Sequence, residues 1–149
     1  MKFNLNDLGS VQQFLKLPGQ RLNYVKKMTA IAMYERLSRR APVLTGRYRW
    51  GFNCSVNGID YTVPPPAPEE YSRNNQVYYN FDAERGIRAF MSVGIADDVA
   101  VANSTPYAAA LENGHSRQAP GGIFRMTIPE VKEDLKKYAA MAQAKDGGL

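Results

Sequence analysis

The stretch NSTPYAAALENGHSRQAPGGIFRMT, residues 103–127, packs a short helix, a polar loop and a strand-like run into 25 residues. A Ser or Thr before Pro106 caps the helix, and Pro106 suits the first helical position because its φ is already fixed. Residues 113–114, Asn-Gly, end the helix since both tolerate positive φ. Residues 123–128 read as a strand. A loop held by ordered structure at both ends suits contact with a partner; the alternative is an ordinary helix–loop–strand connection.

A second stretch, APVLTGRYR at residues 41–49, accompanies the first. Together the two resemble the tail-completion or neck proteins of tailed bacteriophages. Members of that family carry P-x-x-T-G-R-x-R after an N-terminal helix, and then N-x-x-P-Y-A-x-x-L-E-x-G-H-S-x-Q-A-P-x-G before a C-terminal strand and helix. Both motifs occur here in that order, so the resemblance covers residues 20–142. The second motif is long and specific, whereas the first alone would be weak.

The resemblance implies a structural virion protein located in the neck or at the top of the tail and assembled in the host cytoplasm. It implies a ring of six copies on the path of the genome DNA, with no reaction catalysed. The expected partners are further copies of the chain, the head-side connector protein, and the tail tube or tail terminator protein. Head–tail joining and termination of tail growth both remain open as roles.

Subunit and partner contacts are assigned to an aromatic arm at residues 61–81 and to a loop at residues 112–122, supported by Arg47 and Arg49. For the arginines, the alternative is an ordinary polar strand face; for the arm, it is a hairpin packed on its own domain. The side chains assigned to these contacts, besides the two arginines, are Tyr61, Tyr71, Tyr78, Tyr79, Tyr107, Glu112, His115, Arg117 and Gln118.

The chain has 149 residues, of which 44% are hydrophobic and 22% charged, as expected for one globular domain. No apolar run approaches the roughly 20 residues that span a bilayer, and the N-terminus does not resemble a signal peptide. We therefore expect a soluble, cytoplasmically made protein without membrane contact. Cys54 is the single cysteine, which excludes an internal disulfide and zinc-type cysteine spacing.

The charge is unevenly distributed along the chain. Residues 1–50 hold ten Lys and Arg against two acidic residues, a net of +8, and residues 51–149 hold nine against twelve, a net of −3. This asymmetry fits docking to an acidic protein surface, and it equally fits contact with nucleic acid. The alternative function is therefore non-specific DNA binding in the host cytoplasm, although no DNA-binding motif accompanies the charge.

The predicted fold is α+β: one domain with a mostly antiparallel sheet of about four strands, flanked by a long N-terminal helix and a C-terminal helix. The helices are expected at residues 20–40 and 129–142, the second capped by Thr127. Strands are expected at residues 47–56, 88–95 and 100–103. Other segments are an N-terminal arm (1–19) with a short helix after Ser10, a Pro/Tyr-rich extended loop (59–85) and a frayed tail (143–149).

The sequence gives little support for a catalytic function. Glu112 and His115 have the spacing of a metal pair, but the sequence supplies no second histidine for a catalytic zinc site. A Cys54/His115 nucleophile lacks an oxyanion-loop signature. Residues 121–122, Gly-Gly, lack the lysine of a phosphate loop. We expect no enzyme, catalytic residue, metal, cofactor or small-molecule substrate.

Overall fold

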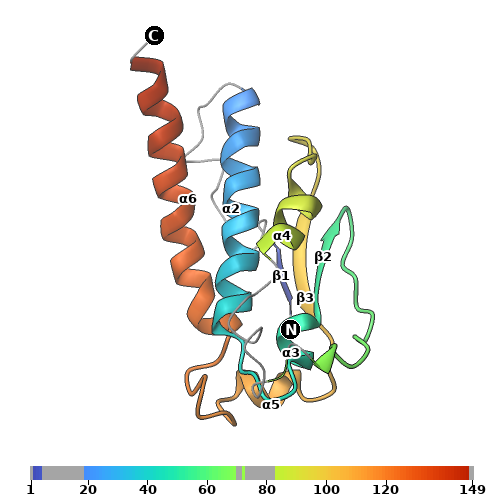
Figure 1. Ribbon diagram of the computed structural model, residues 1–149. Coiled ribbons are helices and arrows are strands. Elements are labelled where there is room, and N and C mark those ends of the chain that lie inside the picture. Colours follow the sequence, from blue (N-terminus) through green and yellow to red (C-terminus); the bar gives the residue numbers. More distant parts are fainter. Residues whose placement is uncertain (1, 5–18, 70–71, 73–82, 148–149) are drawn as a thin grey trace.

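Two long antiparallel helices and a small antiparallel sheet dominate the computed structural model, which describes residues 2–4, 19–69, 72 and 83–147 (Figure 1). Helix α2 (Gly19–Arg40) lies between α6 (Phe124–Gly147) on one side and the sheet with α4 (Ala83–Phe90) on the other. The prediction of an α+β fold with long N- and C-terminal helices is therefore confirmed.

The central position of α2 explains its burial. The apolar residues of α2 that recur at three- and four-residue steps form a stripe, which is buried at Val25, Thr29, Ala32, Met33 and Leu37 and partly exposed at Leu22. Burial extends beyond the stripe because α2 packs against α6 and also against α4 and β3. The buried side chains of α2 are Val25, Thr29, Ala30, Ile31, Ala32, Met33, Tyr34, Leu37 and Ser38.

The described sheet has three antiparallel strands in the order β1-β3-β2. The strands are β1 (Lys2–Asn4), β2 (Phe52–Val56) and β3 (Val99–Asn103). The central strand β3 is buried at every position and confirms the strand predicted at 100–103. Of these strands, only β2 and β3 reach five residues. The described part of the chain therefore has fewer strands than the four or so expected, and that expectation is wrong.

Two predicted strand segments are helical instead. Residues 47–50 form α3 (Arg47–Trp50), because Tyr48 and Phe52 are buried together four residues apart, with ring centroids at 5.4 Å. Residues 88–90 belong to α4, and turns follow to Ile95. Helix α4 approaches α2 closely at Gly86, where a Cβ atom would lie 2.7 Å from the Tyr34 ring.

The predicted strand at 123–128 is also wrong, because α6 begins at Phe124 and includes Thr127 as a buried residue rather than as its cap. The helix continues to Gly147, past residue 143 where the tail was expected to start. Before it, α5 (Ala108–Glu112) confirms that a short helix forms in this stretch and ends at Asn113, its C-cap. The helix begins two residues after Pro106, and its N-cap is Tyr107 without a side-chain hydrogen bond, so the predicted Ser or Thr cap and the helical position of Pro106 are wrong.

The Pro/Tyr-rich section is described in part. Residues 59–68 have no regular structure, and residues 83–85 already belong to α4. Tyr71, Tyr78 and Tyr79, like the predicted helix after Ser10, lie outside the described residues. None of the described helices has both the length and the apolar character that a membrane crossing requires.

Candidate functional site

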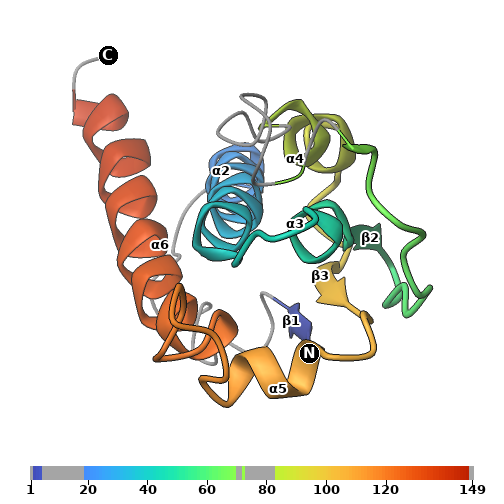
Figure 2. The same cartoon turned by 60° about the horizontal axis from the view of Figure 1, so that its bottom comes forward.

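The two sequence motifs meet at one end of the molecule, where α3, α5 and the first turn of α6 gather (Figures 1 and 2). Gln118 from the second motif bonds both peptide groups of Val43 from the first. Its Oε1 accepts from Val43 N at 3.0 Å, and its Nε2 donates to Val43 O at 3.1 Å. A primary amide that pairs both groups of one residue fixes position and orientation together. Gln118 therefore ties the two motifs to each other.

Asn103, the first residue of the second motif, makes a further tie. Its Nδ2 donates to Tyr48 O at 2.7 Å, and its Oδ1 accepts from Thr105 N at 3.1 Å and from the Thr105 hydroxyl at 2.9 Å. Asn103 is completely buried, so both ends of its amide need these partners. The Tyr48 side chain is buried here as well, and burial raises the pKa of its phenol above the ordinary value.

Glu112 is the N-terminal cap of α6. Its Oε2 accepts from the backbone N–H groups of Ile123 and Phe124 at 3.0 Å each, and its Oε1 accepts from Arg125 N at 2.8 Å. These donors have no partner inside the helix, and the carboxylate also faces the positive end of the helix dipole. The side chain is buried, with 5% of the residue exposed. Glu112 therefore sets where the loop ends and α6 begins.

Two glycines allow the loop between α5 and α6 to close. Gly122 has φ 88°, and a Cβ atom there would lie 2.7 Å from Glu112 O and 2.8 Å from its Oε1. Gly114 has φ 85°, and its Cβ would lie 2.5 Å from Pro120 O. A side chain at either position would displace the backbone that faces it. Gly122 thus allows close packing around the Glu112 carboxylate, and Gly114 allows the close approach of Pro120.

Arg47 and Arg49 bond backbone carbonyls of their own chain. Arg47 donates to Pro64 O at 3.0 and 3.3 Å, which holds the Pro-rich segment against α3. Arg49 donates to Arg39 O at 3.3 Å and Ala41 O at 3.2 Å, at the end of α2 where carbonyls lack intrahelical partners. Both arginines therefore stabilise the connection between the first motif and its surroundings.

Other side chains of the same end face solvent. We call Leu44, Tyr107, His115, Arg117 and Met126 the motif-end surface. Its apolar members are exposed by 70% at Leu44, 39% at Tyr107 and 48% at Met126, and the polar side chains of His115 and Arg117 are exposed beside them. Among the other predicted contact residues, Tyr61 is exposed on the segment that follows β2.

The partners considered from the sequence for His115 are the Glu112 carboxylate and the Cys54 thiol. The Glu112 carboxylate is engaged by three backbone donors. Cys54 lies on β2, and burial raises the pKa of its thiol to about 12, so the thiol is protonated at neutral pH. Within the described ranges, no three His, Cys, Asp or Glu residues form a group that could hold a metal.

Two of the six basic residues of α2 pair with acidic residues of α6. Arg36 bonds the carboxylates of Asp134 and Glu130, and Arg40 bonds Glu130 together with the Thr127 hydroxyl at 2.8 Å. The hydrogen bond from Arg40 lowers the pKa of Glu130, and the bond to Asp134 raises the pKa of Arg36. Part of the charge asymmetry between the two halves of the chain is thus neutralised by ion pairs within the molecule.

Sequence reasoning missed several residues that build this end. Asn103 was quoted in the motif without a role, and nothing local indicated that Val43 would bind Gln118. The excess of acidic residues after residue 50 was a usable signal for the ion pairs between α2 and α6.

Comparison of the chain with protein-family models, curated proteins and solved structures gives no match.

Proposed function

We propose that this chain is an assembly protein of a tailed bacteriophage that acts in the neck or at the top of the tail. It completes the tail and joins it to the head as a ring of six copies. The proposal rests on the resemblance of the two motifs. The single observation that supports it best is the pair of hydrogen bonds between Gln118 and Val43, which makes the two motifs one structural unit.

The polar motif residues hold the loop, and neighbouring side chains face outward. Gln118, Glu112 and Asn103 bond the backbone, whereas Leu44, Tyr107 and Met126 expose apolar surface. A loop fixed from within can bind without losing much conformational entropy. The motif-end surface is therefore the proposed docking surface for the next subunit or for the connector.

A closed ring requires heterologous contacts, in which one patch of a subunit meets a different patch of its neighbour. The motif-end surface would supply one patch of each contact. The exposed segment around Tyr61 would supply the other, with Tyr71, Tyr78 and Tyr79 as its predicted continuation. The head-side connector, the tail tube or the tail terminator protein would then dock to the faces of the ring, with the genome DNA passing through.

The DNA-binding alternative gains no support from the arrangement of charge. Arg36 and Arg40 bond acidic side chains of α6, and Arg47 and Arg49 bond carbonyls. Each of these guanidinium groups already has an internal partner, so a phosphate would have to compete with it or use the remaining N–H donors. Non-specific binding draws its affinity from cations that neutralise phosphates. We accordingly propose assembly, with no catalysed reaction, as the function.

Electron microscopy of lysates from a phage lacking this gene tests the proposal. Filled heads beside separate tails of normal length are the expected result and indicate a joining role. Overlong tails would assign the same ring to termination of tail growth. Normal, intact particles would overturn the neck proposal, and salt-sensitive DNA binding would then be measured on the purified protein.

A further inference from the structure

Residues 60–68, DYTVPPPAP, follow β2 at the surface of the molecule, and we call them the proline segment. None of these residues belongs to a helix or a strand. Proline fixes its own φ and pushes the residue before it toward extended conformations. From Val63 to Pro68, every residue is a proline or directly precedes one. The covalent chain itself therefore favours an extended, polyproline-like conformation here before any contact forms.

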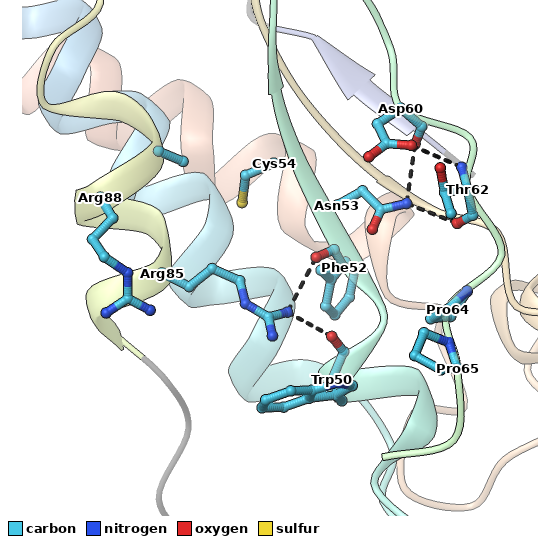
Figure 3. Close-up of a pocket in the computed structure, with 11 residues that line it drawn as sticks. Trp50, Phe52, Asn53, Cys54, Asp60, Thr62, Pro64, Pro65, Arg85 and Arg88 are labelled. Carbon is cyan, nitrogen blue, oxygen red and sulfur yellow. Dashed lines mark hydrogen bonds between the residues drawn. The ribbon is translucent and has the colours of Figure 1, made fainter. Parts of the chain in front are cut away.

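The body of the protein holds the proline segment at every second carbonyl (Figure 3). Asn53 Nδ2 donates to Asp60 O at 3.2 Å and to Thr62 O at 2.8 Å. Arg47 donates to Pro64 O at 3.0 and 3.3 Å, and the Pro64 ring is buried. The segment is thus both stiff and fixed to the domain, so that little conformational entropy is lost when it binds.

The side chains between the held carbonyls are apolar and exposed. Tyr61 is exposed by 59% and Val63 by 54%, and the exposed Pro65 continues the row. Single exposed apolar side chains are ordinary, whereas several gathered together mark a site of interaction. The proline segment therefore offers a fixed apolar row to a partner.

The charge around this row is negative. Residues 57–69 contain two charged side chains, Asp60 and Glu69, and both are acidic and exposed. A hydrogen bond with Thr62 lowers the pKa of Asp60, so its carboxylate is ionised at neutral pH. A partner surface that is apolar and basic would match both features of the segment.

The motif-end surface has that composition. The two motif stretches, residues 41–49 and 103–126, contain one acidic residue, Glu112, and it is buried as the cap of α6. Arg117 and Arg125 are exposed there, beside the apolar side chains described above. Opposite potentials of this kind fix the register of an interface and speed its formation.

We propose that the proline segment of one copy of the chain binds the motif-end surface of the next copy. Tyr61 and Val63 pack against the exposed Leu44 and Met126 of that copy. The acidic residues of the segment lie toward its arginines. This inference rests on the ring of the proposed function and specifies which residues meet at each contact between subunits. The segment runs beside β2, whereas the motif-end surface lies where α3 and α5 gather, so the contact is heterologous (Figures 1 and 2).

Sedimentation velocity of two single variants and of their mixture tests the contact. Val63→Glu alters the proline segment and Leu44→Glu alters the motif-end surface. Both side chains are more than half exposed, so the urea midpoints should match that of the wild type. Each variant alone lacks one half of every contact, and its self-association is expected to be about 30-fold weaker, the effect of a hot-spot residue.

The equimolar mixture is expected to form heterodimers. The intact segment of the Leu44→Glu protein can bind the intact motif-end surface of the Val63→Glu protein, with the affinity of the wild-type contact. Contacts of either surface with itself would instead let one of the variants associate alone, and mixing would add nothing. The mixture therefore distinguishes a heterologous contact from an isologous one.

A matched control is Met141→Glu, which adds the same charge to α6 at a residue exposed by 43% and should associate as the wild type does. Added salt should weaken wild-type association, because the opposed charges are exposed. A monomeric mixture, a Val63→Glu or Leu44→Glu protein that associates like the wild type, or a wild type that is monomeric at about 1 mM would each overturn the proposal.

Failure of this contact and failure of the neck role give different results. Heterodimers in the mixture, together with normal particles from the phage that lacks the gene, would overturn the neck role and support the contact. A monomeric mixture, together with unjoined heads and tails from that phage, would overturn the contact and support the neck role.

Discussion

Replacement of Glu112 by alanine should destabilise the protein more than any exposed substitution. The change removes the acceptor of three backbone N–H groups at the start of α6. Two of these donors belong to Ile123 and Phe124, which are 0% and 1% exposed, so water cannot readily replace the carboxylate there. A stranded buried donor costs about 1–3 kcal/mol, and the Arg125 donor is nearer to solvent. We expect Glu112→Ala to lower the free energy of unfolding by about 3 kcal/mol.

Urea unfolding followed by circular dichroism measures this loss, and thermal unfolding should show a fall of about 10 °C in Tm. Glu112→Gln retains one acceptor oxygen and should lose less. The matched control is Glu133→Ala, whose side chain is 72% exposed and pairs with Lys136, and which should change stability by no more than about 0.5 kcal/mol. If Glu112→Ala unfolds at the same urea concentration as the control, the reasoning about the cap is refuted.

Three further changes test the motif unit and its neighbouring ion pairs. Gln118→Ala should cost about 1 kcal/mol and speed amide exchange in the loop, whereas the exposed Arg117→Ala should do neither; equal exchange rates would contradict this. Gly122→Ala should cost about 2–3 kcal/mol in urea unfolding because of its positive φ and close contacts, and Gly19→Ala should be neutral. Arg40 lowers the folded-state pKa of Glu130, so the stability that this carboxylate adds is present above its unfolded pKa and is lost as pH falls through the folded one. The stability difference between the wild type and Glu130→Gln should therefore shrink from pH 6 to pH 3, and a constant difference would count against the pair.

The elements predicted correctly are those whose pattern is local. The periodicity of residues 20–40 indicated α2, and the apolar run at 100–103 indicated β3, because one buried stripe or one buried strand follows from spacing alone. The start of α6 could not be predicted in this way. Its cap, Glu112, lies eleven residues before Ile123 and reaches it only when the loop has closed.

Residues 47–52 show a different limit. Tyr48 and Phe52 satisfy an alternating pattern and a four-residue helical spacing equally well. The helix forms because both rings fit the same part of the core, and sequence spacing does not report that fit. In the same way, the close approach of α4 to Tyr34 at Gly86 depends on tertiary packing, which local spacing does not report.

For the candidate site, the sequence located the two segments but not their contact. The motifs at residues 41–49 and 103–122 indicated where to look, yet the bonds between Gln118 and Val43 join positions 75 residues apart. The predicted contact residues fall into two groups in the structure. Glu112 and Gln118 bond the backbone of their own chain, while Tyr107, His115 and Arg117 are exposed.

The most direct test of the proposed assembly role is complementation of the gene-deleted phage with a folded surface variant. Leu44→Glu combined with Arg117→Glu alters the motif-end surface without removing any hydrogen bond described above, and its urea midpoint should match that of the wild type. Lys136→Glu, on the exposed face of α6, is the control because it also makes the surface of the protein more negative. We predict that the double variant leaves filled heads and tails unjoined in electron micrographs while the control restores infectious particles. Normal particles with the double variant would contradict docking through this end of the molecule.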